Sequence, residues 1–236
     1  MRGIETDQGA SLEAFLAAWD RQLHALVPTV GFAVMGLTNF GEHPVSSTRL
    51  AEVLGIPVSK AEALAHAHCT TGEPVDEGYN RVDDGLITFN PGQAPSGPRR
   101  WLQIGERRLG MTGCAPDVLL YAPLVRPSLQ VEEPCPATGI PIRLTFTPSR
   151  VESVEPTTAV VAMPPVQVLD RADAMSVWEV DANICGQCPF YSSAEAAQGW
   201  LANFPGGRIF PVREAWDLSV FRDWRDRMSA LLNLDA

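Results

Sequence analysis

The chain has 236 residues, of which 45% are hydrophobic, and its formal net charge of −10 gives a pI of about 4.8. This composition is typical of a globular protein that buries a core in one or two domains. The acidic balance disfavours general binding to nucleic acid or to an anionic membrane, because both are negatively charged. No apolar run approaches the roughly 20 residues of a membrane span, and no signal peptide is evident. We therefore expect a cytoplasmic protein with reduced thiols.

An amphipathic helix is predicted directly after a loose tail at residues 1–10. Ser11 is a residue type that caps helix N-termini, and LEAFLAAWDRQLHALV follows it. Apolar side chains recur there at helical spacing, so one face should pack against a core. These residues are Leu12, Phe15, Leu16, Trp19 and Leu23.

A pair of short helices is predicted next, in HPVSSTRLAEVLGIPVSKAEALAHAH. Ser46 or Ser47 can begin the first helix, and Gly55 can end it. Ser59 and Glu62 form a capping box for the second helix. Two short helices joined by a tight connection are typical of helix-turn-helix arrangements.

The stretch after this helix pair predicts a wing. The letters DDG at residues 83–85 favour a turn, and LITFN directly after them is typical of a strand. Residues 1–90 thus resemble a small winged-helix-like domain, with two interpretations: DNA binding, or a structural or substrate-covering role. The second helix carries Lys60 but no arginine cluster, which disfavours DNA binding in an acidic chain.

The remainder of the chain predicts a larger domain of mixed strands and helices. Residues 91–100 are rich in Pro, Gly and Ser and indicate a linker or long loop. Strands are expected in RWLQIG, RRLGM, IRLTFT and AVVAM. One closing helix should begin near Ser192 and Ser193, with Glu195 completing a capping box, and another should run from Ala215 to Leu232. The expected fold class is α+β, with the larger domain at residues 101–236.

The five cysteines offer the most distinctive chemistry. Cys185 and Cys188 form a C-x-x-C pair, which could hold zinc, cycle as a disulfide or give thiolates to another soft partner. A four-thiolate zinc site usually brings two such pairs, whereas Cys69, Cys114 and Cys135 are isolated. A thioredoxin-like pair should follow a strand and open a helix, an arrangement that the residues after Cys188 do not match well.

Cys114 and Asp117 form a second candidate pair. If the segment after Cys114 is helical, a spacing of three residues places the thiol and the carboxyl group on one face. A thiolate binds soft metals, and a carboxyl group buried beside apolar residues has a raised pKa and can act as an acid. The alternative is a buried cysteine beside an aspartate that only caps the helix.

Several segments, taken in order, resemble the organomercurial (alkylmercury) lyase family. ERRLGMTGCAPDVLLYAPLV is similar to the family's first catalytic segment, in which a cysteine precedes an aspartate by three residues. ICGQCPFYSSAEAAQGWL is similar to the segment with the second catalytic cysteine. VSSTRLAEVLGIPVSKAEA, CPATGIPIRLTFTPSRVESVEP and REAWDL are similar to the N-terminal helical domain, a cysteine-containing turn and the start of the last helix. The combination is specific, although each piece alone is weak.

The resemblance implies an enzyme that cleaves carbon–mercury bonds by protonolysis, with residues 101–236 as its catalytic domain. Cys114 matches the first catalytic cysteine, Asp117 the catalytic aspartate and Cys185 the second catalytic cysteine, while Cys135 matches a cysteine regarded as structural. Mercury is soft, so two thiolates would hold it, and Asp117 would protonate the departing carbon. The products would be a hydrocarbon and Hg(II) bound to Cys114 and Cys185.

The resemblance also bears on cofactors and partners. It implies no bound cofactor, with mercury as substrate and product, and removal of Hg(II) by cellular thiols or a mercuric reductase. Thr112 and Gly113 stand where the family usually has large aromatic residues, and Cys188 is an extra thiol that could also capture mercury. Two alternatives stay open: a divergent lyase-like enzyme for another small molecule, and a cysteine-based metal-binding or sensor protein.

Overall fold

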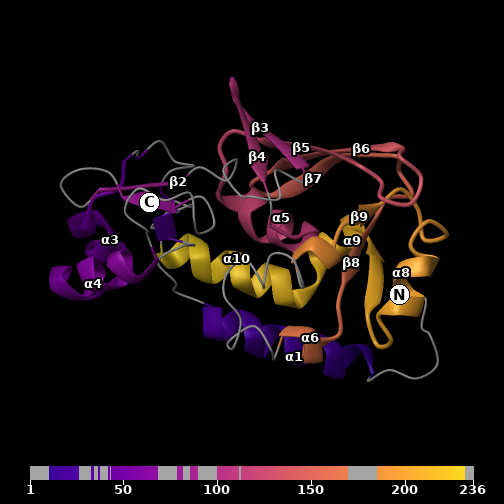
Figure 1. Cartoon of the computed structure of the whole chain (residues 1–236), viewed down its shortest axis with the longest axis horizontal. Coiled ribbons are helices and arrows are strands. Elements are labelled where there is room, and N and C mark those ends of the chain that lie inside the picture. Colours follow the sequence, from indigo (N-terminus) through magenta and orange to yellow (C-terminus); the bar gives the residue numbers. More distant parts are fainter. Residues whose placement is uncertain are drawn as a thin grey trace.

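The structure, a computed structural model, describes residues 11–26, 33–34, 37, 42, 44–68, 79–81, 86–89, 100–111, 113–169 and 185–231. Figure 1 shows helices lying against antiparallel sheets, which confirms the predicted α+β class. The predicted tail, Cys69, the turn at 83–85, residues 91–99 and Thr112 lie outside the described residues. Within the described part, each helix is too short or too polar to cross a bilayer.

Helix α1 (Leu12–Leu26) forms as its sequence predicts. The Oγ of Ser11 accepts a hydrogen bond from the Ala14 N–H at 3.2 Å, and Phe15 and Trp19 are buried. The helix packs against α10 (Ser219–Leu231), near the other end of the chain, and the indole N–H of Trp19 donates to the Pro164 carbonyl at 3.2 Å. The first helix is thereby joined to elements of the C-terminal half.

The predicted helix pair is present as α3 (Ser47–Leu54) and α4 (Val58–His68). Ser46 caps α3 by accepting from the Arg49 N–H at 3.1 Å, and Gly55 ends it with a φ of 63°. The predicted capping box of α4 is wrong. The Ala61 N–H donates to the Pro57 carbonyl at 3.0 Å, so Pro57 is the N-cap residue, two residues before Ser59, and Ser59 lies inside the first turn.

A small hairpin follows the helix pair. Strands β1 (Tyr79–Arg81) and β2 (Ile87–Phe89) are antiparallel, and Ile87 also bridges to Val45, just before α3. A hairpin at this place has the order of elements expected for a wing. The winged-helix description and the domain boundary at residue 90 stay predictions.

A five-stranded antiparallel sheet has the order β4-β3-β5-β6-β7. The predicted strands appear as β3 (Arg100–Ile104), β4 (Arg107–Met111) and β6 (Pro141–Thr147), joined by two that the sequence analysis did not identify, β5 (Leu129–Pro134) and β7 (Arg150–Glu155). Alternate residues of β5 are buried, so one face of the sheet lies against the core and the other faces solvent. The short helices α5 (Ala115–Tyr121) and η3 (Ala122–Leu124) follow β4, and α5 packs against α10.

A three-stranded sheet has the order β10-β8-β9, from β8 (Val160–Met163), β9 (Phe190–Tyr191) and β10 (Arg208–Pro211). Helices α6 (Val166–Leu169) and α8 (Gln198–Asn203) belong to this half. The helix predicted near Ser192 and Ser193 begins later, at Gln198. Ser193 Oγ instead accepts from the Ala196 N–H at 3.2 Å and caps a run of turns that precedes α8.

The last predicted helix is two helices. Helix α9 (Val212–Asp217) ends at Leu218, whose ψ of 138° is extended, and α10 begins directly after it. The break lets Trp216 on α9 and Trp224 on α10 both turn into the core, where Trp224 is fully buried. The prediction of one continuous helix from Ala215 to Leu232 is therefore wrong.

Candidate active site

Cys114 and Asp117 lie together at the start of α5. Cys114 is the N-cap residue and is buried, with 8% of the residue exposed. The Oδ2 of Asp117 accepts a hydrogen bond from the Cys114 backbone N–H at 2.6 Å. The segment is helical as predicted, and the spacing of three residues brings the carboxylate back to the cysteine. Asp117 therefore does cap the helix, as the alternative interpretation of this pair expects. The same hydrogen bond holds its carboxylate beside Cys114.

Gly113 leaves the space that this carboxylate occupies. A Cβ atom at position 113 would lie 2.7 Å from the Asp117 Oδ2 and 2.8 Å from the Met111 Cε, closer than real Cβ contacts come. A side chain immediately before Cys114 would therefore force the Asp117 carboxylate and the Met111 methyl group to shift.

The C-x-x-C segment lies against the same end of α5. Cys185–Gln187 form the short 3-10 helix η5, and the carbonyl of the following Cys188 accepts from the Ala115 N–H at 2.8 Å. Cys188 is 1% exposed. The structure thus brings the backbone of this segment to the first residue of α5. The Cys185 side chain lies outside the described part, so its place beside Cys114 stays a prediction.

A buried ion pair, which the sequence analysis missed, joins these segments to the sheet. Arg100 on β3 and Glu133 on β5 are 1% and 3% exposed, and their Nε and Oε2 atoms are 2.5 Å apart. Arg100 also donates to the Gly113 carbonyl, and the Glu133 Oε1 accepts from the Phe190 N–H at 2.7 Å. The pair therefore contacts the residue before Cys114 and a residue shortly after Cys188.

The charge of Arg100 also acts on the candidate site. Burial lowers the pKa of Arg100, but the negative charges of Glu133, Cys114 and Asp117 outweigh burial and raise it. Electrostatic interaction is mutual, so this cation attracts negative charge on Cys114 and Asp117. Thiolate is the form that binds soft metals.

Cys135 lies in a different environment, in the turn after β5. Its sulfur accepts hydrogen bonds from the Ser192 N–H and hydroxyl group, both at 3.4 Å. Burial raises the pKa of this thiol, but hydrogen bonds from Ser192 and Thr138 outweigh burial and lower it to about 7. These bonds tie the β5–β6 turn to the segment after β9, as suits a structural cysteine.

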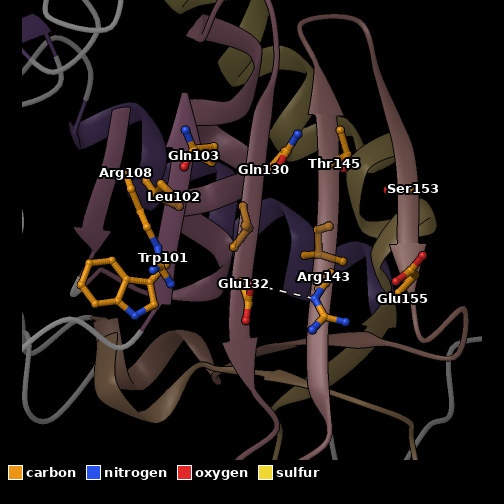
Figure 2. A pocket seen from close by; sticks show the side chains of 12 residues that line it. Trp101, Leu102, Gln103, Arg108, Gln130, Glu132, Arg143, Thr145, Ser153 and Glu155 are labelled. Atoms are coloured by element: carbon orange, nitrogen blue, oxygen red, sulfur yellow. Dashed lines mark ion pairs between the residues drawn. The ribbon is translucent and has the colours of Figure 1, made fainter. Parts of the chain in front are cut away.

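The outer face of the five-stranded sheet carries an open pocket of about 450 Å³ (Figure 2). Arg108 stacks over the Trp101 ring at 4.5 Å, and Glu132 lies 3.9 Å from Arg143. The described residues that line the pocket include no cysteine. Because successive residues of a strand point to opposite faces, Arg100 and Glu133 lie on the other side of the sheet from Trp101 and Glu132. The pocket is therefore separate from the candidate site.

No group of three or more His, Cys, Asp or Glu side chains that could hold a metal ion occurs among the described residues. The side chain of Cys185 is not among them, because the structure describes the backbone of this residue alone. A role for Cys188 as a further mercury ligand remains a prediction.

Comparison with known proteins identifies the family. The family model for alkylmercury lyase (MerB) matches residues 101–223. The alkylmercury lyase of Pseudomonas putida is 33% identical over 178 residues, covering 70% of this chain and 76% of that protein. The Bacillus cereus alkylmercury lyase is 39% identical over 105 residues, which is 44% of each chain. For Streptomyces lividans the identity is 37% over 107 residues, or 45% of this chain and 46% of the relative.

The chain thus aligns with less than half the length of the Bacillus and Streptomyces relatives. A solved structure, the mercury-bound form of MerB2, superposes on 93% of this chain and 99% of its own with a TM-score of 0.56 and 18% identity. That likeness supports the fold. From the family match and the relative in Pseudomonas putida, this chain belongs to the alkylmercury lyase family.

Proposed function

We propose that this protein is an organomercurial lyase, which cleaves carbon–mercury bonds by protonolysis to a hydrocarbon and Hg(II). Cys114 and Cys185 are the proposed mercury-binding thiolates, and Asp117 is the proposed proton donor. The observation that carries the proposal is the contact of the Asp117 carboxylate with Cys114, at a helix end to which the Cys185–Cys188 segment is hydrogen-bonded. Membership of the alkylmercury lyase family supports the same chemistry.

The reaction can be written with these residues alone. One thiol gives its proton to the Asp117 carboxylate, and the resulting thiolate bonds to the mercury of R–Hg⁺. The second cysteine loses its proton to solvent, and its thiolate adds to the same mercury. The added electron density weakens the carbon–mercury bond. That bond then breaks with its electron pair on carbon, which takes the proton from Asp117. The hydrocarbon leaves, Hg(II) stays on two thiolates, and the carboxylate is regenerated.

Product removal completes the proposed cycle. Mercury held by two thiolates exchanges onto external thiols, so cellular thiols or a mercuric reductase are the expected acceptors. Cys188 lies beside α5 and is proposed as an accessory thiol for this transfer. We expect no resident cofactor, no nucleic-acid or membrane partner, and a cytoplasmic location.

The N-terminal part is proposed to form a winged-helix-like domain over residues 1–90, followed by a linker at 91–100 and the catalytic domain at 101–236, onto which its first helix α1 packs. The helix pair α3–α4, followed by the β1–β2 hairpin, supports this assignment. In an acidic chain this domain more readily covers the substrate than binds DNA. A gel-shift assay with upstream DNA, with and without Hg²⁺, checks the DNA-binding alternative.

The function is tested by incubating the protein with methylmercury or phenylmercury and excess dithiothreitol and measuring methane or benzene. Asp117→Asn keeps an acceptor for the Cys114 N–H but has no proton to give, so the rate should fall by roughly 10²- to 10⁴-fold with Hg²⁺ binding retained. Cys114→Ser and Cys185→Ser should abolish release, whereas Cys188→Ser should reduce it little. A folded wild-type protein that binds Hg²⁺ but releases no hydrocarbon would contradict the proposal and favour the divergent-enzyme alternative.

A further inference from the structure

The Arg100–Glu133 pair connects segments that are far apart in sequence. Both residues belong to neighbouring strands of the five-stranded sheet, with Leu102 of β3 opposite Val131 of β5. Each side chain is nearly inaccessible, at 1% and 3% exposed. Phe190, which donates a hydrogen bond to Glu133, lies on β9, and β9 pairs with β8 in the three-stranded sheet.

Each partner of the pair holds one of the two cysteine segments. Arg100 donates to the carbonyl of Gly113, which immediately precedes Cys114. Glu133 uses its Oε1 to accept from the N–H of Phe190, two residues after Cys188, while its Oε2 binds Arg100. The guanidinium carbon of Arg100 also lies 5.8 Å from the centre of the Phe190 ring. The chain of contacts thus runs from Gly113 through both charges to Phe190.

We infer that Arg100 and Glu133 are positioning residues, which fix the Cys114 segment relative to the Cys185–Cys188 segment so that one mercury can be shared between them. A buried ion pair gives little stability over apolar side chains of similar size, because its desolvation offsets its attraction. This pair also makes hydrogen bonds to the Gly113 carbonyl and the Phe190 N–H, which apolar side chains could not make. The functional meaning of the inference rests on the proposed function, but the geometry does not.

A positioning role predicts different effects on Hg²⁺ binding, which uses two thiols, and on labelling of a single thiol. Binding of Hg²⁺ by two thiols depends on how well their segments are held together, since the second bond is intramolecular. Reaction of a single thiol with a small monofunctional reagent has no such dependence. Loosening the pair should therefore weaken Hg²⁺ binding by a larger factor than it slows the labelling of one thiol, and a variant that keeps the charge of Arg100 should leave that labelling unchanged.

The test uses the full chain and the double variant Arg100→Met/Glu133→Leu, which removes both charges at similar volume. The measurements are the melting temperature, the Hg²⁺ affinity in competition with dithiothreitol, and the rate at which methyl methanethiosulfonate labels Cys114, resolved by mass spectrometry. A control is Arg49→Met/Glu42→Leu, which removes another multiply hydrogen-bonded ion pair, between Glu42 and Arg49 of α3, that is more exposed and distant in sequence from both cysteine segments. The variant Arg100→Lys keeps the charge but lacks the planar fork that reaches Glu133 and Gly113 together.

The expected result for the double variant is a folded protein whose Hg²⁺ affinity falls by about 10- to 100-fold, with an unaffected control. Cys114 labelling loses the favourable charge of Arg100 and should fall by a smaller factor. Wild-type Hg²⁺ affinity in the folded double variant would overturn the inference. If the double variant does not fold, Arg100→Lys decides: weaker Hg²⁺ binding with unchanged labelling supports positioning, and unchanged binding refutes it. Because these readouts need no turnover, a wild-type protein that fails to release hydrocarbon refutes the proposed function and leaves this test intact.

Discussion

At the scale of single residues, Gly113 decides where the Asp117 carboxylate can lie. A Cβ atom there would be 2.7 Å from the Asp117 Oδ2, so Gly113→Ala should displace the carboxylate from the Cys114 N–H. We expect the rate of hydrocarbon release to fall by about 10-fold or more, since a shift of about 1 Å at a catalytic group can cost 100-fold.

The control for this substitution is Gly199→Ala. Gly199 is in α8, where a Cβ atom would meet nothing within 4 Å, so alanine should leave the release rate unchanged. Equal rates for Gly113→Ala and wild type, from single-turnover measurements, would show that the close approach does not constrain Asp117.

The Cys135 thiol should make the free energy of unfolding depend on pH. Its pKa in the folded protein is about 7, below the ordinary value of 9.0, because Ser192 and Thr138 donate hydrogen bonds that outweigh burial. A depressed pKa means that the folded state favours the thiolate. This contribution to the free energy of unfolding is complete above pH 9 and is lost as pH falls through about 7.

The measurement compares wild type with Cys135→Ala by urea unfolding between pH 7 and pH 9. The stability advantage of the wild type should grow as pH rises through this window, and Ser192→Ala, which removes the hydroxyl donor alone, should show a smaller growth. An advantage that is constant across the window would show that the thiolate is not favoured by folding.

At the scale of elements, the sequence predicts best where a local signal determines the structure. Ser11 and Ser46 accept from backbone N–H groups in the first turns of α1 and α3, and Gly55 ends α3 in the left-handed conformation. The break at Leu218 was missed because the apolar spacing of Trp216 and Val220 continues across it. Apolar spacing along the sequence does not show a change of backbone conformation at one residue, such as the extended ψ of Leu218.

The same limit explains what was found and missed in the candidate site. The spacing of Cys114 and Asp117 is local, so their juxtaposition could be predicted, whereas Arg100 and Glu133 are brought together only by the pairing of β3 with β5. Glu133 is adjacent to the exposed Glu132, and charged residues in a strand ordinarily face solvent. Neither residue carried a signal that distinguished it from an exposed one.

The packing of α1 against the C-terminal half gives a prediction at this scale. The Phe15 ring lies 6.4 Å from that of Phe210 on β10 and 6.4 Å from that of Trp19. Phe15→Ala should lower the free energy of unfolding by about 3 kcal/mol, because it leaves a cavity where α1 meets the sheet. Val58→Ala is the control, since Val58 is 41% exposed and should change stability by no more than about 0.5 kcal/mol.

Urea unfolding followed by tryptophan fluorescence measures both variants. A loss below about 1 kcal/mol for Phe15→Ala would mean that α1 contributes little to the stability of the half that holds the candidate site. The expected loss instead places α1 within the same cooperative unit as β10 and α10.

At the scale of the whole molecule, the candidate site lies where the two sheets meet. Cys114 follows β4 of the five-stranded sheet, whereas the Cys185–Cys188 segment leads into β9 of the three-stranded sheet. Helix α5 packs against β8 and α10, so the first cysteine rests on elements of the second half. A reaction that needs both thiols therefore depends on how the sheets are joined.

The Arg100–Glu133 pair is part of that junction, and its energetics can be predicted. Arg100→Met alone removes the cation and leaves the Glu133 charge buried beside the Phe190 N–H, so the free energy of unfolding should fall by about 3–5 kcal/mol. Removing both charges in Arg100→Met/Glu133→Leu should restore most of that loss, because no unpaired charge remains. Calorimetry of the single and double variants measures the difference. A double variant no more stable than Arg100→Met would show that the pair stabilises the junction by itself, whereas recovery of stability without recovery of Hg²⁺ affinity would separate positioning from folding.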